Sequence, residues 1–227
     1  MPVVCDIVLN LDMKQVLRWQ GIAENRVRPG MTALMQELMV LAENHLLKPT
    51  AGYKTYPVVE VIHDGIRLND FTVVGGGLLS SVLKQASELV VVVCTIGVEL
   101  EEQVATYCAE NEVFRGVLLD GIGSAAVDST LREFDKLIAQ EAISHGYNTS
   151  RPLSPGMPGF PLSEQQRLLE LSGAGEIGVS LTSSGVMKPR KSISAVIGVG
   201  LDMPVWKPTD TCKSCNLKKT CGYRTHA

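Results

Sequence analysis

The chain has 227 residues, of which 45% are hydrophobic and 20% charged, a composition typical of a globular protein and not of a disordered one. Its 21 basic and 24 acidic residues give a net charge of −3, and only 5% of the residues are aromatic. A nucleic-acid-binding protein is expected to have a basic face with stacking rings, so this balance argues against that class. The N-terminal segment lacks the pattern of an export signal, and the longest apolar stretch, 89–96, is too short to span a membrane. We therefore expect a cytoplasmic protein whose six cysteines do not form structural disulfides.

The N-terminal half predicts interleaved strands and helices. Alternation of apolar and polar residues indicates a strand, and apolar residues three or four positions apart indicate a helix. These patterns predict a strand over 3–11, helices over 12–19, 32–47 and 78–88, a buried strand over 90–95 and a helix from Gly97 onward. The dipeptide Asp64-Gly65 separates two strand-like runs within 56–74, which predicts a hairpin.

The C-terminal half begins with the longest predicted helix, over 114–145, in which Gly121 and Gly123 loosen the first turns or let another backbone approach. Four prolines make 151–161 a loop, and the patterns that follow predict a helix over 163–171 and strands over 177–181 and 193–201. The irregular order of elements and the hairpin predict an α+β fold, a twisted antiparallel sheet with flanking helices. We expect one domain over 1–204 and a basic, cysteine-rich tail over 205–227.

The sequence contains no familiar catalytic motif. The glycine run 75–77 lacks the Gly-Lys-Ser/Thr ending of a phosphate-binding loop, and the four histidines are scattered. We therefore predict no catalytic residues from the motifs alone.

A known family is suggested by the segment 151–198. It contains R-P-L-S-P-G-M-P-G-F-P, then I-G-V-S-L-T, and then M-K-P-R-K-S-I-S. An arginine that begins a Pro-Gly-rich loop, followed by these strands at similar spacing, resembles the activation domain of vitamin B12-dependent methionine synthase. The resemblance is greatest to the separate small proteins related to that domain, and it implies the same fold over 1–204.

This resemblance implies a function in cobalamin repair. In that family, S-adenosylmethionine methylates cobalamin after its cobalt has lost an electron, and the activation domain positions the donor over the corrin. The chain would then be an activation subunit, part of a cobalamin-dependent methyltransferase of the methionine synthase type. Its partners would be the corrinoid-binding methyltransferase and an electron-donor protein. The alternative is a non-enzymatic corrinoid-protein partner, or a metal-binding interaction protein, that has lost S-adenosylmethionine binding.

The resemblance also implies which residues bind the donor. Arg151 stands where the family binds the donor's carboxylate, although an arginine that pins the loop is the alternative. Asp128 falls where the family has a glutamate, with a solvated helix acid as the alternative, and helical spacing places it at a groove edge. Gly156 and Gly159 would let the loop backbone approach the ligand, unless loop geometry alone requires them.

The chain departs from the family at two ligand-contacting tyrosines. Met157 follows Pro-Gly where the family has one tyrosine, and Ile197 replaces the other. We expect the loop 151–161 to lie across the sheet edge beside the helix bearing Asp128 and to form the main groove.

A basic turn precedes the last strand. Lys188, Arg190 and Lys191 surround Pro189. A solvated turn accounts for them, and the functional alternative is a rim that meets an acidic corrinoid-protein surface or a cofactor phosphate.

The tail carries a candidate metal site. Cys212, Cys215 and Cys221 occur in C-K-S-C-N-L-K-K-T-C, where a Cys-x-x-Cys turn and a third cysteine supply three thiolates for one metal. Nearby lysines would lower the pKa values of these thiols. We predict zinc or an iron–sulfur cluster there, against the alternative of an unliganded tail.

Overall fold

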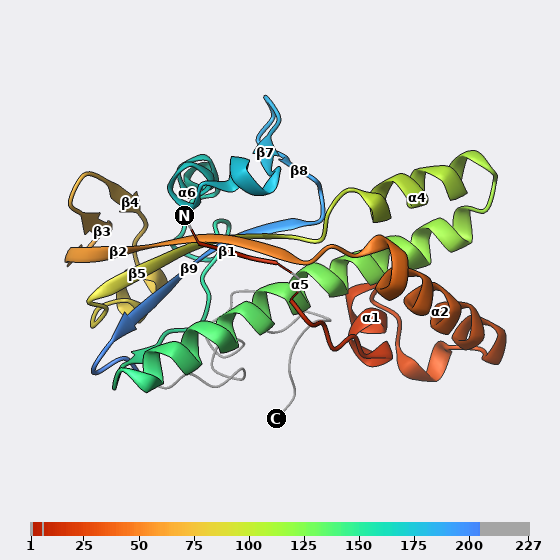
Figure 1. Cartoon of the computed structure of the whole chain (residues 1–227), viewed down its shortest axis with the longest axis horizontal. Helices are drawn as coiled ribbons and strands as arrows, with labels where there is room; N and C mark the ends of the chain where they lie inside the picture. Colours follow the sequence, from red (N-terminus) through yellow and green to blue (C-terminus); the bar gives the residue numbers. More distant parts are fainter. Residues whose placement is uncertain (1, 6, 205–227) are drawn as a thin grey trace.

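The computed structural model describes residues 2–5 and 7–204, and its centre is an antiparallel sheet (Figure 1). Seven strands of this part form the sheet in the order β4-β3-β2-β5-β9-β6, and β1 pairs with β2. The strands are β1 (Val3–Val4), β2 (Thr50–Ile62), β3 (Gly65–Leu68), β4 (Thr72–Val74), β5 (Glu88–Thr95), β6 (Asn148–Thr149) and β9 (Ser192–Gly200). The predicted α+β class with an antiparallel sheet is confirmed.

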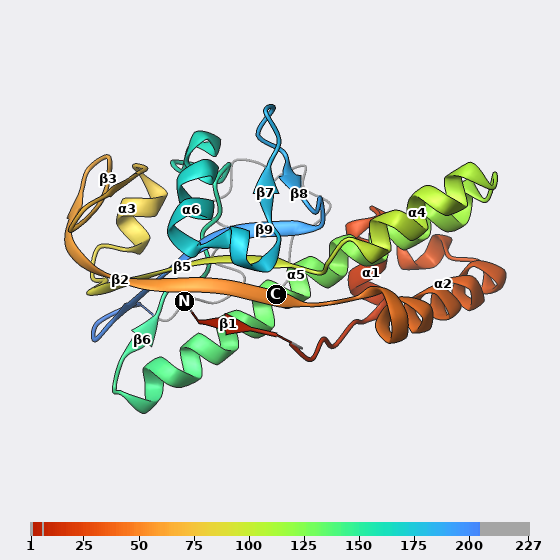
Figure 2. The ribbon, with the colours of Figure 1, turned by 45° about the horizontal axis from the view of Figure 1, so that its top comes forward.

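Helices cover both faces of the sheet, with α5 on one face and α3 and α6 on the other (Figure 2). The helices are α1 (Met13–Trp19), α2 (Pro29–Leu41), α3 (Leu78–Val82), α4 (Glu99–Ala109), α5 (Val113–Ser144) and α6 (Gln165–Ser172). Shorter helical turns are Glu24–Arg26, Ala42–Leu46, Leu162–Glu164 and Ala174–Ile177. A separate two-stranded ribbon consists of β7 (Ser180–Leu181) and β8 (Met187–Lys188). None of the helices in the described residues combines the length and apolar character needed to cross a membrane.

The central strand β5 is buried on both faces, as predicted. Because successive side chains point to opposite faces, Val90, Val92 and Cys94 pack toward α5. Leu89 and Val91 pack on the opposite face in the cluster that includes α3 and α6. The continuous apolar run of β5 is therefore explained by helices on both sides of it.

A second hydrophobic cluster lies beyond one end of the sheet, where α1, α2 and α4 surround the first half of α5 (Figure 1). Gly123 of α5 faces Leu100 of α4, and a Cβ atom at Gly123 would lie 2.7 Å from Leu100 Cδ2. The predicted helix 114–145 is confirmed as one continuous element, and at Gly123 the close approach is that of a side chain and not of a backbone.

The loop 151–161 turns around the β9–β6 edge of the sheet. Leu153 pairs with Val196 of β9, and farther on the carbonyl of Gly159 accepts a hydrogen bond from the N–H of Gly76, ahead of α3. The loop thus leads from the edge beside α5 to the face covered by α3 and α6. It is irregular, as its prolines predicted.

Four predicted elements differ from those observed. The helix 78–88 is reduced to Leu78–Val82, and Glu88 already belongs to β5. The strand 3–11 is reduced to Val3–Val4, because only these residues pair with β2. The hairpin loop is His63-Asp64, one position earlier than expected, since Gly65 already pairs with Ile62. The strand 177–181 is reduced to Ser180–Leu181, because the chain up to Ile177 forms a 3₁₀ turn.

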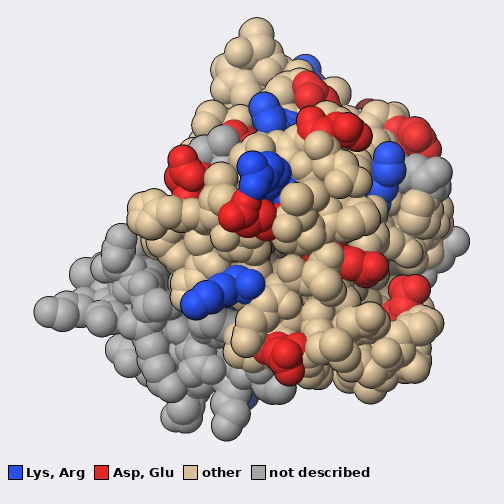
Figure 3. Space-filling model, turned by 90° about the vertical axis from the view of Figure 1, so that its left-hand side faces the viewer, with Lys and Arg blue, Asp and Glu red and all other residues tan. Residues whose placement is uncertain are grey.

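Charged residues of both signs are interspersed on the face shown in Figure 3, which is the left-hand end of the molecule in Figure 1. One ion pair, between Arg67 and Glu60, joins strands β3 and β2. On this face no broad area of one sign is seen among the described residues.

Candidate functional site

One flank of α5 carries a line of polar residues beside the strand β9. At about 100° per residue, Ser124, Asp128 and Asp135 lie within about 40° of one another around the helix. Lys191, directly ahead of β9, donates from Nζ to Ser124 Oγ at 2.9 Å and forms an ion pair with Asp120 at 2.8 Å. These contacts show that the Ser124 end of the line faces Lys191, ahead of β9. We call Ser124, Asp128 and Asp135 the acidic flank of α5.

Asp128 is half-buried on this flank and forms an ion pair with Arg132, 2.7 Å away. Arg132 also donates to the side chain of Gln15 on α1 at 3.2 Å. Asp128 therefore lies where α1, α5 and the β9 side meet. That Asp128 lies at the edge of a groove stays a prediction, since none of the pockets described here contains it.

Asp135 is a carboxylate on this flank that our sequence interpretation did not single out. Its Oδ1 atom is buried and has no hydrogen-bond partner among the described residues. Burial raises the pKa of Asp135 to about 6. The signal that would have found it is its spacing of seven residues, two helical turns, from Asp128.

Arg151 is held at the edge of the sheet by its neighbours. Ser150 donates from its N–H to the carbonyl of Gly198 and accepts from the N–H of Gly198 at 2.9 Å. With Leu153 also paired to β9, Arg151 is fixed alongside β9, and β6, which precedes it, packs against α5. Arg151 and Asp128 thus belong to adjoining elements, although no direct contact between these two side chains is among those described.

The rest of the predicted loop set lies farther from α5. Gly156 and Gly159 have φ values of +93° and +79°, so loop geometry by itself requires glycine at both positions. Met157 is partly buried and packs against the cluster on the α3 and α6 face. Ile197 is fully buried in the sheet beneath α5, as part of the core. The structure therefore places Arg151 beside β9, next to the strand β6 that packs against α5, and carries Met157 to the opposite face of the sheet.

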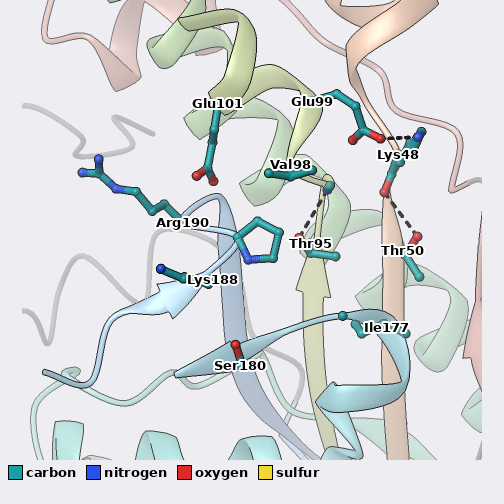
Figure 4. A pocket seen from close by; sticks show the side chains of 13 residues that line it. Lys48, Thr50, Thr95, Val98, Glu99, Glu101, Ile177, Ser180, Lys188 and Arg190 are labelled. Carbon is teal, nitrogen blue, oxygen red and sulfur yellow. Dashed lines mark hydrogen bonds and ion pairs between the residues drawn. The ribbon is translucent and has the colours of Figure 1, made fainter. Parts of the chain in front are cut away.

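A separate pocket of about 640 Å³ lies at the ends of β2 and β5, beneath the start of α4 (Figure 4). Lys48 forms an ion pair with Glu99 there, and this hydrogen bond lowers the pKa of Glu99. Lys188 and Arg190 line the side formed by β8 and the turn that follows. None of the predicted donor-binding residues lines this pocket.

The cationic side chains of the basic turn point to two different parts of the molecule. Lys188 and Arg190 line the pocket, as a rim would. Lys191 instead points to α5, with only 14% of its side chain exposed, and its backbone N–H donates to Glu101 at 2.8 Å. Lys191 is therefore a structural link between α4, α5 and β9 and does not belong to an exposed rim.

Comparison with known proteins assigns the chain to a family. Residues 82–203, more than half of the chain, match the family described as vitamin B12 dependent methionine synthase, activation domain. The chain belongs to this family. The matched region includes the acidic flank, Arg151 and the loop after it, and the basic turn.

A solved structure supports the fold of this activation-domain family member. The chain is similar to the crystal structure of the MetH reactivation domain bound to AdoHcy, with a TM-score of 0.59. The sequences are 14% identical, and the similarity covers 91% of this chain and 81% of the other. At this identity the likeness concerns the fold. No match to a curated protein was found.

Three of the six cysteines of this family member lie among the residues that the structure describes. Cys94 is buried, which raises the pKa of its thiol, and Cys5 and Cys108 are exposed free thiols. No group of three or more potential metal ligands occurs within the described residues. Cys212, Cys215 and Cys221 lie outside them, so the metal site of the tail stays a prediction.

Proposed function

We propose that this protein supports the reductive methylation of a cobalamin carried by a corrinoid methyltransferase, and that it uses S-adenosylmethionine as the methyl donor. It would act as a separate activation subunit. Membership of the activation-domain family supports the role in methionine synthase activation. The observation that supports the choice of donor is the position of Arg151, which is fixed beside β9 and directly follows β6, a strand that packs against α5, the helix of Asp128.

The residues at this edge fit the charges of the donor. S-adenosylmethionine has a carboxylate, an ammonium group and a sulfonium. The Arg151 guanidinium suits a carboxylate, which it can bind through two parallel hydrogen bonds. Asp128, a carboxylate on α5, suits the cationic groups of the donor. The partner's cobalamin would supply the cobalt that accepts the methyl group.

In this function the chain contributes binding and orientation. Holding the donor in line with the acceptor raises the effective concentration of one relative to the other. Arg151 would fix the amino-acid end of the donor against the sheet edge, and Asp128, held by Arg132, would fix it from the helix side. We assign no residue to proton transfer or nucleophilic attack.

A second candidate function is supported by Ile197. Its side chain is fully buried in the core, at a position where the resemblance implied a ligand-contacting tyrosine. A chain without that contact fits a protein that has kept the corrinoid-protein surface and lost the donor. In that case it would act as a non-enzymatic partner.

Titration with the donor distinguishes the two functions. We expect S-adenosylmethionine and AdoHcy to release heat on binding in isothermal titration calorimetry. Arg151→Ala should weaken both affinities by about tenfold or more, since it removes a charge-assisted bond. Arg67→Ala, which removes an exposed arginine on β3, is the matched control and should leave both affinities unchanged.

Two further measurements complete the test. Circular dichroism of Arg151→Ala checks that the variant is folded. Transfer of a labelled methyl group from S-adenosylmethionine to the corrinoid protein tests the reaction itself. If the wild-type protein binds neither compound yet copurifies with a cobamide-binding protein, the donor assignment is wrong and the second candidate function holds.

A further inference from the structure

We propose that the pocket at the ends of β2 and β5 binds a small organic phosphate, whose phosphate group is held by Ser180, Lys188 and Arg190. This inference goes beyond the proposed function, because the pocket contains none of the residues assigned to the donor. Its volume of about 640 Å³ is typical of small-molecule sites in proteins. Apolar side chains, among them Val98 and Ile177, form other parts of its lining, as such sites require.

The pairing of β7 with β8 places two of the polar residues side by side. Ser180 and Lys188 are register partners in this two-stranded ribbon, so their side chains point to the same face of it. The neighbouring Leu181 and Met187 point to the other face, where they pack against the buried cluster that includes Val179. One face of the ribbon therefore contributes to the core, and the other lines the pocket.

Two positive charges of the pocket are not neutralised by neighbours. Lys48 is paired with Glu99, whereas no ion pair of the described residues includes Lys188 or Arg190. Figure 4 shows the side chains of Lys188 and Arg190 extending to the same side of the pocket. A phosphate monoester carries about two negative charges at pH 7 and accepts charge-assisted hydrogen bonds, so it matches these two cations.

The carboxylate of Glu101 indicates how the ligand is oriented. Glu101 lines the pocket from α4, and its Oε1 atom accepts a hydrogen bond from the backbone N–H of Lys191 at 2.8 Å. Its negative charge repels a phosphate on the α4 side, but it can accept a further hydrogen bond from a hydroxyl group. This arrangement favours a ligand with a phosphate at one end and hydroxyl groups at the other, such as a sugar phosphate.

Hydrogen bonds between the surrounding segments fix the walls of the pocket. Ser192 Oγ lies 3.0 Å from Thr95 Oγ1 and 2.7 Å from the carbonyl oxygen of Pro189. The backbone N–H of Gly97 donates to Thr95 Oγ1 at 3.3 Å. The end of β5, the start of α4 and the turn before β9 are thus joined at one point. A site whose walls are already fixed loses less conformational entropy when a ligand binds.

The experiment is isothermal titration calorimetry of the full chain with ribose 5-phosphate and, as the uncharged control, ribose. We expect ribose 5-phosphate to bind with a Kd of about 1 mM or lower, and ribose to bind at least about tenfold more weakly. Neither compound contains an adenine or an amino acid, so neither tests the donor site. Arg151→Ala should accordingly bind ribose 5-phosphate as the wild type does.

A pair of double variants assigns the binding to the basic turn. Lys188→Ser with Arg190→Ser should weaken ribose 5-phosphate binding by about tenfold or more, because both charge-assisted contacts are lost. Arg67→Ser with Lys84→Ser is the matched control, since it removes one exposed arginine and one exposed lysine outside the pocket. It should bind ribose 5-phosphate with the wild-type affinity.

The phosphate site is overturned if the wild-type protein binds no ribose 5-phosphate at about 10 mM, or binds ribose equally well. It is also overturned if the Lys188→Ser, Arg190→Ser protein keeps the wild-type affinity. If that protein keeps the affinity but no longer copurifies with the corrinoid protein, the basic turn is a docking rim instead. None of these results depends on S-adenosylmethionine, so the proposed function is tested separately.

Discussion

Among individual residues, Asp135 reduces the stability of the protein. Its pKa is raised from 3.8 to about 6, so the folded protein holds this proton more tightly than the unfolded chain. Stability therefore falls as the pH rises from about 4 to 6, and above pH 6 the full cost of the buried charge is present. A shift of about two units corresponds to about 3 kcal/mol.

Asp135→Asn should consequently stabilise the protein at neutral pH. We expect the free energy of unfolding to rise by about 2–3 kcal/mol at pH 7.5 and to change little at about pH 3, where the carboxyl is neutral in the folded state and largely so in the unfolded chain. Urea denaturation at the two pH values measures this. Equal changes at both pH values would mean that the ionisation of Asp135 is not the cause.

Lys191 illustrates what spacing cannot indicate about a residue. It stands beside Arg190 in a basic turn, and the sequence suggests a common role. Its partners Asp120 and Ser124 lie about seventy positions earlier, on a helix that the fold brings beside β9. Only the tertiary structure decides which of two adjacent cations faces inward.

At the level of the elements, the packing of α4 on α5 depends on Gly123. A Cβ at this position would lie 2.7 Å from Leu100 Cδ2 and 3.3 Å from Lys191 Cε. We expect Gly123→Val to lower the free energy of unfolding by about 1–3 kcal/mol, because the larger side chain overpacks this contact. Denaturant melts of the purified variant test it.

Gly30→Ala is the control for that substitution. A Cβ at Gly30 in α2 meets nothing within 4 Å, so alanine should be neutral or stabilise by up to about 1 kcal/mol. A Gly123→Val protein as stable as this control would show that α4 does not approach α5 closely.

The long helix and the central strand could be predicted because their patterns are strong and local. The stripe of α5 and the apolar run of β5 each reflect burial against a continuous surface. The strands 3–11 and 177–181 were overestimated because a strand needs a partner as well as a pattern. Beyond Val4 the described chain up to α1 pairs with no strand, and before Ser180 it forms a 3₁₀ turn.

For the molecule as a whole, the tail is the largest untested part of the sequence prediction. Anaerobically purified protein should contain about one equivalent of zinc, or iron with acid-labile sulfide, bound through Cys212, Cys215 and Cys221. Elemental composition and the visible absorption spectrum distinguish the two metals.

Two double variants test whether these cysteines are the ligands. Cys212→Ser with Cys215→Ser should lose the metal, because one thiolate alone cannot hold it. Cys5→Ser with Cys108→Ser removes the two exposed thiols of the described part and should keep it. Wild-type protein with only trace metal would leave these cysteines as an unliganded end.

The candidate site was predictable only in part. Arg151 and Asp128 were reached through the family resemblance, because neither residue belongs to a motif that specifies its chemistry. Met157 and the loop glycines were grouped with them by their closeness in sequence, but the loop carries these residues around the sheet edge. Helical spacing could have predicted that Asp135 lies in line with Asp128. That its Oδ1 atom has no hydrogen-bond partner among the described residues could be recognised only from the structure.

The continuity of α5 has a consequence for how the protein unfolds. The helix has 32 residues and is about 48 Å long. Its first half packs in the hydrophobic cluster with α1, α2 and α4, and its second half packs on the sheet. Unfolding of either cluster would expose apolar side chains of the same helix to water. The two clusters should therefore unfold in a single cooperative transition. In a hydrogen-exchange experiment, slowly exchanging amide protons should be found along the whole of α5, with no boundary at its middle.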